Sequence, residues 1–290
     1  MRILVTGKNG QLGSEMQAIS ENYTEHKFIF TGSSELDITD AIAVDSFFQQ
    51  NALDVVINCA AYTAVDKAED EPNEAHKVNV IGVKNIVDAC AKYNVKLIHI
   101  STDYVFDGTK NEPYSTIDAV SPIGVYGKTK LEGEQVVLNS NIASFIVRTS
   151  WVYSIFGNNF VKTMLRLGAE RTEVSVVDDQ YGSPTYAKDL AKACVEMSLQ
   201  TPNWPEKPTV YHYSNEGIIS WFEFAQEIML LANLSCSVLP IKTEQYPTKA
   251  ARPKYSALDT AETERKFHSD TNNWSDSLKE MIASIKQPKC

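Results

Sequence analysis

Short, continuously apolar runs alternate with longer segments in which apolar residues recur every three or four positions over the first part of the chain. A run with no polar face is typical of a strand buried on both sides of a parallel sheet, and the helical spacing predicts helices that cover that sheet. The expected strands are RILVTG (2–7), KFIFTG (27–32), DVVINCAA (54–61), KLIHIST (96–102) and SFIVRTS (144–150). The pattern therefore predicts an α/β fold with a doubly wound parallel sheet of the Rossmann type.

The alternation loosens after about residue 150, where short helical segments mix with proline-bearing loops. The segment TVYHYSN (209–215) has the character of another strand, so we expect it to return to the sheet. We therefore expect a sheet domain made of residues 1–150 and about 188–214. A smaller C-terminal lobe would then comprise about 151–187 and 215–290.

Composition narrows the class of partner. The net charge is -10 and no long basic cluster occurs, which argues against a nucleic-acid or anionic-membrane partner and favours a small molecule. The five cysteines form no C-x-x-C pair and no apolar leader follows Met1, so we expect reduced thiols in a cytoplasmic protein. The histidines show no zinc-binding spacing, so no metal is expected to do the chemistry.

A glycine-rich loop follows the first expected strand. In GKNGQLG, Gly7, Gly10 and Gly13 provide a tight turn, a close approach of the backbone to a pyrophosphate, and close packing of helix on strand. The helix that begins there would add free amides and the positive end of its dipole. We interpret the loop as a dinucleotide site; a purely structural turn is the alternative.

The end of the second strand bears on which dinucleotide binds. Ser33 and Ser34 in FTGSSELD stand where an acidic residue would bind the ribose diol of NAD, with Glu35 just beyond. No arginine is present there to hold a 2'-phosphate. NADPH is preferred, with NADH as the alternative. The residues expected near the adenine and along the cofactor are Asp37, Ile38, Ala60 and Ala61.

The stretch VSPIGVYGKTKLEGE (120–134) places a tyrosine and a lysine four residues apart at the start of an expected helix. Tyr126 and Lys130 would lie on one face of that helix. A nearby ammonium and an oxidised nicotinamide would both favour the phenolate and lower the tyrosine pKa, which would make the phenol a usable general acid. A solvent-facing pair on a surface helix is the alternative.

Two further polar positions support a site. Thr102 ends the strand KLIHIST, at the carboxyl edge where open α/β sheets bind ligands, and could donate to a substrate carbonyl beside Tyr126. Asn79 lies inside an otherwise apolar helix and needs a partner. A relay through water to Lys130 would provide one.

Taken together, the motifs resemble those of the extended short-chain dehydrogenase/reductase family. The resemblance covers nearly the whole chain and rests on GKNGQLG, NCAAYTAVDKAE, VNVIGVKN, ISTDYVFDG, YGKTK, RTSWVY, GSPT and RPKYSAL. It implies that Tyr126 protonates a carbonyl oxygen, Lys130 tunes it and holds the nicotinamide ribose, and Thr102 fills the third, hydroxyl-bearing position. It also makes the sheet domain dinucleotide-binding and the smaller lobe substrate-binding.

The resemblance implies further contacts. Thr102 and Asp103 would touch a sugar, on which Trp151 would pack, although a tryptophan packed in the core is the alternative. The cofactor would be lined by Gln11, Leu12, Asp37, Ile38, Ala61, Tyr62 and Thr63. Because a helix is expected to begin near them, the residues proposed to meet phosphates are Asn158, Asn159 and Lys162, with Arg252 as a separate candidate whose alternative is a solvated side chain.

The activity implied is reduction of the C4 keto group of dTDP-4-dehydro-L-rhamnose by NADPH to give dTDP-L-rhamnose, which supplies rhamnose for surface polysaccharide. Two alternatives stay open: another nucleotide-sugar reductase or epimerase, and a non-catalytic regulatory subunit that binds the cofactor. Some similar proteins dimerise through a magnesium ion held by acidic residues. Glu15 fits the first of those places, but Lys188 stands where a second acid would help, so no metal and a monomer are preferred to a metal-bridged homodimer.

Overall fold

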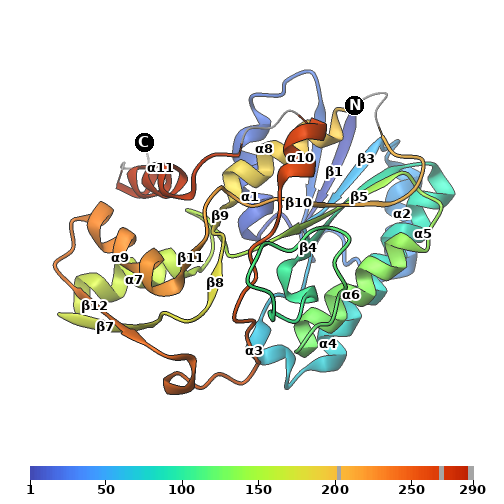
Figure 1. The fold of residues 1–290 in the computed structure, drawn as a ribbon. Helices are drawn as coiled ribbons and strands as arrows, with labels where there is room; N and C mark the ends of the chain where they lie inside the picture. The colour runs from blue at the N-terminus through green and yellow to red at the C-terminus, as the bar shows by residue number, and fades with distance from the viewer. Residues whose placement is uncertain (201–203, 268–270, 287–290) are drawn as a thin grey trace.

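The computed structural model describes residues 1–200, 204–267 and 271–286. Its largest sheet has six strands in the order β10-β5-β4-β3-β1-β2, and every neighbouring pair is parallel (Figure 1). The strands are β1 (Arg2–Thr6), β2 (Lys27–Thr31), β3 (Val55–Asn58), β4 (Lys96–Thr102), β5 (Ser144–Thr149) and β10 (Thr209–His212). The predicted doubly wound parallel sheet is confirmed.

Helices cover both faces of this sheet because each strand is apolar on both sides. In β1, Ile3 and Val5 pack in one core cluster with α1 (Gln11–Ser20) and α8 (Ala187–Ser198). Leu4 points the other way, into a second cluster under α2, α5 and α6. That second layer consists of α2 (Ala41–Gln50), α5 (Val83–Tyr93) and α6 (Val125–Leu138).

Short helical segments connect β3 to the second layer and β4 to the loop beyond it. They are α3 (Val65–Ala68), α4 (Pro72–His76), the π-helical turn η1 (Lys77–Gly82) and the 3₁₀ turn η2 (Asp103–Val105). The order of the strands reverses between β1 and β3, since the chain passes from β1 to β2 and then crosses to the other side of β1. Ligands of open α/β sheets bind at such a reversal, outside the carboxyl ends of the strands.

A second group of elements lies beside the sheet and has its own apolar cluster (Figure 1). Its helices are α7 (Phe160–Glu170), α9 (Trp221–Ala232), η3 (Thr243–Gln245) and α11 (Trp274–Lys286). Its strands are β6 (Val152–Tyr153), β7 (Glu173–Val177), β8 (Tyr181–Gly182), β9 (Thr185–Tyr186), β11 (Ile219–Ser220) and β12 (Ser237–Ile241). One more helix, α10 (Ala261–Phe267), packs on the sheet instead, with Phe267 against Phe145.

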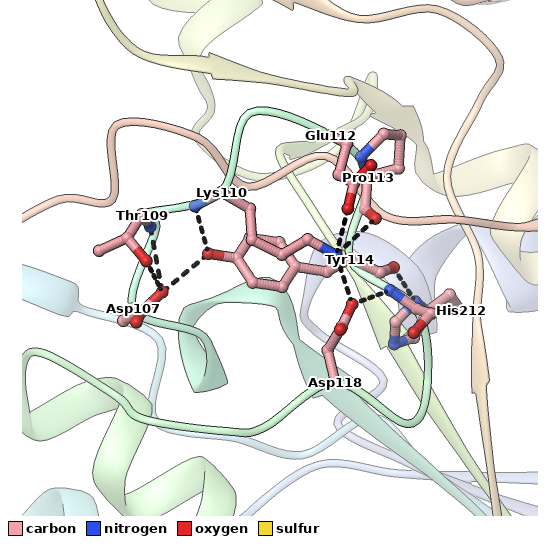
Figure 2. Close-up of polar contacts among 9 residues, drawn as sticks. Asp107, Thr109, Lys110, Glu112, Pro113, Tyr114, Asp118 and His212 are labelled. Atoms are coloured by element: carbon pink, nitrogen blue, oxygen red, sulfur yellow. Dashed lines mark hydrogen bonds and ion pairs between the residues drawn. The ribbon is translucent and has the colours of Figure 1, made fainter.

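The loop between β4 and α6 is fixed by a network of polar contacts (Figure 2). Asp107 accepts a hydrogen bond from the Tyr114 hydroxyl at 2.8 Å, and Lys110 pairs with Asp118 at 2.8 Å. The Nδ1–H of His212, from β10, donates to the Tyr114 carbonyl at 3.1 Å, since a carbonyl oxygen can only accept. The loop that joins Thr102 to α6 is therefore anchored to the sheet.

Within the described ranges, no helix combines the length and apolar character needed to cross a membrane. Cys59, Cys90, Cys194 and Cys236 are free thiols, and Cys290 lies outside the described residues.

Candidate functional site

A cavity of about 540 Å³ opens at the carboxyl edge of β1, β3, β4 and β5. The predicted site residues that line it are Gly10, Gln11, Leu12, Gly13, Ala61, Thr63, Thr102, Asp103, Tyr126, Lys130, Trp151 and Asn158. Residues that sequence reasoning did not single out also line it, among them Asn9, Cys59, Tyr104 and Ser150. The topology thus brings together motifs that lie far apart in the chain.

The glycine loop lies close to the backbone that follows β3. Gly7 has φ +70°, and a Cβ there would lie 2.7 Å from backbone atoms of Cys59 and Ala60. A Cβ on Gly13 would lie 2.3 Å from the Gly7 carbonyl oxygen. Gly10 is the N-cap of α1, whose first amides face the cavity edge without a side-chain cap. The loop therefore leaves room and free donors for an anion beside the helix N-terminus.

A lysine in the glycine loop reaches the end of β2. Lys8 Nζ donates to Glu35 Oε1 at 2.7 Å, and the Gly32 amide donates to the other carboxylate oxygen at 2.9 Å. The hydrogen bond from Lys8 is the main reason that the Glu35 pKa falls to about 2. No arginine was expected near Ser33 and Ser34, and the pairing of β1 with β2 instead places a lysine at the end of β2, paired with Glu35.

Asp37, Ile38, Ala60 and Tyr62, which were expected along the cofactor, are not among the residues that line the cavity. The Asp37 carboxylate accepts from the amide and hydroxyl of Thr39, which lower its pKa. Ile38 is buried in the second apolar cluster. The contacts of these four residues with a cofactor stay predictions.

Tyr126 and Lys130 lie in the first two turns of α6, as predicted, and both side chains are buried. This burial contradicts the alternative of a solvent-facing surface pair. Tyr126 packs edge-on against Tyr104, with ring centroids 5.5 Å apart, and Lys130 Nζ donates to the Ile100 carbonyl at 2.7 Å. Both residues face the end of β4, where Thr102 lies.

The protonation equilibria differ from the sequence expectation. Burial raises the Tyr126 pKa to about 12, although a hydrogen bond with Thr102 opposes the shift. Burial also lowers the Lys130 pKa to about 8, with the Glu134 carboxylate opposing. The expected lowering of the tyrosine pKa is absent in the protein alone because desolvation dominates and the Lys130 ammonium is bound to a backbone carbonyl.

Thr102 and Asp103 form a buried hydroxyl–carboxylate pair. Thr102 Oγ1 donates to Asp103 Oδ1 at 2.9 Å and accepts from the Tyr104 amide at 3.2 Å. Burial raises the Asp103 pKa to about 6, against hydrogen bonds from Ser256 and Thr102. The carboxyl group thus changes charge close to neutral pH, next to Tyr126.

Asn79 lies in the π-helical turn η1 and has direct protein partners. Its Oδ1 accepts from the Tyr62 amide at 2.9 Å, and its Nδ2 donates to the Tyr62 carbonyl and the Thr129 hydroxyl, both at 3.1 Å. Thr129 in turn donates to the Tyr126 carbonyl at 3.0 Å. Asn79 therefore ties the loop after β3 to α6, and its relay to Lys130 stays a prediction.

A second cavity of about 400 Å³ adjoins α7, β7 and α9 in the smaller lobe. Trp221 lines it and stacks on Trp151, which lines the first cavity, with ring centroids 3.5 Å apart. Trp151 has φ +46°, and Gly182 leaves room for its indole, because a Cβ there would lie 2.7 Å from Trp151 Cε2. Trp221 thus covers one face of the Trp151 ring, which also lines the first cavity, and the packing of a sugar on Trp151 stays a prediction.

The phosphate candidates have protein partners. Arg252 lines the second cavity and forms two hydrogen bonds, of 3.0 and 2.7 Å, with Asp66. Asn159 caps α7 and donates to Gln11 Oε1 at 2.9 Å. Lys162 Nζ donates to the Gly157 carbonyl at 2.6 Å. These contacts hold the cavity walls, so a phosphate would have to compete for Arg252 and Lys162.

The residues around Glu15 do not fit a magnesium site. Glu15 is buried, accepts from the Ser154 hydroxyl at 2.6 Å, and has a pKa raised by burial. Lys188 pairs with Glu280 at 2.5 Å and places its ammonium near Glu15. The Asp189 carboxylate accepts from the side chains of Asn215, Asn272 and Ser277. Across the described ranges, no cluster of three or more His, Cys, Asp or Glu side chains could hold a metal ion.

Extended short-chain dehydrogenases/reductases are the class that this fold and this cavity define, as the sequence resemblance implied. The model of the family described as "RmlD substrate binding domain" matches residues 1–287, and the chain belongs to that family.

Three relatives illustrate the similarity. The "dTDP-4-dehydrorhamnose reductase" of Aggregatibacter actinomycetemcomitans is 39% identical over 290 residues, covering 97% of this chain and 98% of the relative. The "spore coat polysaccharide biosynthesis protein SpsK" of Bacillus subtilis is 40% identical over 257 residues, covering 89% and 88%. The crystal structure of the Bacillus anthracis dTDP-4-dehydrorhamnose reductase in complex with NADP is 41% identical, with a TM-score of 0.92 and coverage of 98% and 99%.

Replacing Asp103 by asparagine should stabilise the ligand-free protein. A carboxyl whose folded pKa, about 6, exceeds its unfolded value contributes stability at low pH that is lost as pH rises through 6. The free energy of unfolding of Asp103→Asn should therefore exceed that of wild type by about 1–3 kcal/mol at pH 7.5, and by less near pH 5. Urea unfolding across this range measures the difference. A variant that is less stable than wild type at pH 7.5 would contradict the assignment.

Proposed function

We propose that this chain catalyses the NADPH-dependent reduction of the C4 keto group of dTDP-4-dehydro-L-rhamnose to dTDP-L-rhamnose, which supplies rhamnose for surface polysaccharide. The observation that carries the proposal is the buried group of Tyr126, Lys130 and Thr102 in the same cavity as the glycine loop. The relatives named as reductases of this substrate, at about 40% identity over nearly the full length, support the choice of sugar.

A nicotinamide dinucleotide fits the sheet edge. Gly7, Gly10 and Gly13 leave space for a pyrophosphate at the N-terminus of α1, and Ala61 and Thr63 would flank the rest of the cofactor. When bound, this group supplies the hydride. The NADP in the Bacillus anthracis relative supports the same cofactor here.

Residues of the chain itself would supply the proton that the carbonyl oxygen takes up. Tyr126 would donate its phenolic proton to the carbonyl oxygen, with Thr102 as a second donor to the developing alkoxide. Because burial raises the Tyr126 pKa to about 12 in the protein without cofactor, the phenol is protonated and can serve as the acid. The Lys130 ammonium is charged below about pH 8 and is bound to the Ile100 carbonyl in the protein without cofactor. Turned toward the cofactor, it would hold the nicotinamide ribose and lower the Tyr126 pKa.

We propose that residues 1–150 with about 188–214 bind the dinucleotide, and that the remaining residues of the C-terminal part form a substrate-binding lobe. The second cavity would take the nucleotide end of the sugar nucleotide, with Arg252 turning from Asp66 to the diphosphate. Asn158 lines the first cavity. The neighbouring Asn159 and Lys162 fix the loop before α7, because Asn159 accepts from the Lys162 amide and Lys162 Nζ donates to the Gly157 carbonyl. The Trp151–Trp221 stack would lie between the sugar and the nucleotide.

The test is oxidation of NADPH, and separately NADH, by purified protein given dTDP-4-dehydro-L-rhamnose made in situ. We expect rapid oxidation by wild type and a loss in kcat/KM of about 10²–10⁴-fold for Tyr126→Phe, because the general acid is removed. Tyr104→Phe, which removes a neighbouring hydroxyl from the same cavity, is the matched control and should keep most of the activity. A folded, cofactor-binding protein that oxidises neither cofactor would contradict the proposal and favour another nucleotide sugar or a regulatory subunit.

Cofactor preference should depend on the Lys8–Glu35 pair. A 2'-phosphate near Ser33 would compete with Glu35 for Lys8, so Glu35→Gln should tighten NADPH binding and Lys8→Gln should weaken it, each by roughly threefold to tenfold. NADH, which lacks the phosphate, serves as the control ligand in calorimetric titrations. Equal changes for both cofactors would place the 2'-phosphate elsewhere.

We also propose that the protein acts in the cytoplasm as a monomer. Lys188 supplies a positive charge between Glu15 and Glu280, where a bridging metal would otherwise be needed to balance the acids. Light scattering should give the mass of one chain, 32.3 kDa, both with Mg²⁺ and with EDTA. A dimer that dissociates when EDTA is added would overturn this.

A further inference from the structure

Three charged side chains are buried together behind the proposed active site. Lys130, Glu134 and Arg148 are 2%, 0% and 3% exposed. Tyr126, Lys130 and Glu134 follow one another at four-residue intervals, so they share one face of α6. Burying charges is costly unless each is paired, so a group of three next to a catalytic tyrosine needs a physical explanation.

Glu134 is fully engaged by β4 and β5. Its Oε1 accepts from Ser101 Oγ at 2.5 Å and from Arg148 Nε at 2.9 Å, and its Oε2 accepts from Arg148 Nη2 at 2.7 Å. Ser101 and Arg148 are partners in the register of the two strands. The preceding residue of β4, Ile100, binds Lys130 through its carbonyl. Consecutive residues of one strand therefore hold the lysine and the glutamate of the same helix.

Arg148 connects this group to the anchored loop of Figure 2. Its guanidinium lies 5.1 Å from the centroid of the Phe106 ring, which stacks on Tyr114. His212 packs edge-on against Phe106, and burial lowers the His212 pKa to about 3, so the imidazole is neutral. Within the described part of the chain, the ion-pair partner of Arg148 is Glu134.

The groups that face Lys130 leave Glu134 as the main charge acting on it. Cys59 lies beyond β3 and is a neutral thiol, since burial raises its pKa to about 12. His99 in β4 is neutral, because burial holds its pKa well below the usual value. Tyr126 is neutral below about pH 12. The negative charge of Glu134, partly offset by Arg148, is therefore what opposes the loss of the Lys130 proton.

We propose that Glu134 and Arg148 are positioning residues for the reaction: Glu134 keeps the buried Lys130 side chain in its charged, Ile100-bound state, and Arg148 holds Glu134 in place and limits its effect. This inference rests on the proposed function, in which Lys130 tunes Tyr126 and holds the ribose. This role would explain why the Glu134–Arg148 ion pair is buried although neither residue lines a cavity.

The proposal predicts shifts of opposite sign in the alkaline limb of the pH–rate profile. Glu134→Gln removes the favourable charge and leaves Arg148 unbalanced, so the limb should move to lower pH by about one unit or more. Arg148→Met leaves Glu134 unopposed and should move the limb to higher pH. Glu134→Asp keeps the charge and should keep the limb close to its wild-type position, even if kcat falls.

The experiment measures kcat/KM for NADPH oxidation from pH 6 to 10 in wild type and these variants, with circular dichroism to verify folding. Glu134→Gln leaves the buried Arg148 without its ion-pair partner, which can prevent folding. The double variant Glu134→Gln/Arg148→Met therefore provides a second test, since replacing both partners of a buried ion pair is often tolerated. Its limb should lie below that of wild type but above that of the single glutamine variant.

Variants that differ from wild type only in the height of the profile, with an unmoved limb, would reduce the pair to a purely structural role and overturn the proposal. The pH dependence of NADPH affinity, measured by calorimetry on the same proteins, reports on Lys130 without turnover. If wild type binds NADPH but does not oxidise it, the proposed function fails, while the shifts in the binding profile still decide whether Glu134 controls Lys130.

Discussion

The burial of a lysine ammonium at the carboxyl edge of the sheet is the constraint on which the site depends. The Lys130 ammonium donates a hydrogen bond to the Ile100 carbonyl, and the negative charge of Glu134 opposes the loss of its proton. Glu134 is in turn paired with Arg148. Each partner comes from a different element, so the charge is tolerable only when α6, β4 and β5 are packed in one arrangement. The same arrangement fixes Tyr126 beside Thr102.

The parallel sheet supplies the rest of the geometry. Because every strand of the sheet ends at the same edge, the glycine loop after β1, Ala61 after β3 and Thr102 at the end of β4 reach one cavity although they are far apart in the chain. The loop from β4 to α6 is anchored through Tyr114 and His212, so the proton donors on either side of it keep a fixed separation. The smaller lobe adds a second cavity, separated from the first by two stacked tryptophans.

The local sequence patterns predicted the strands, the glycine turn and the shared helical face of the tyrosine–lysine pair. The apolar runs gave the strands, the glycine spacing gave the turn before α1, and the four-residue interval placed Tyr126 and Lys130 on one helical face. Contacts between distant segments were not predictable in this way: Arg252 meets Asp66 across 186 positions, and Lys8 meets Glu35 through strand pairing. In the protein without cofactor the Tyr126 pKa is raised by burial, and this desolvation depends on packing that a single sequence does not display.

Transfer of deuterium from the cofactor to the sugar would show whether the C4 carbonyl is the group that this protein reduces. Protein, dTDP-4-dehydro-L-rhamnose and NADPH deuterated at C4 of the nicotinamide, on the face that is transferred, would be allowed a single turnover, and the sugar product examined by NMR. We expect deuterium at C4 of dTDP-L-rhamnose with wild type, and almost none with Tyr126→Phe over the same reaction time. Deuterium at another carbon, or an unlabelled sugar from a fully active protein, would contradict hydride transfer to the C4 carbonyl.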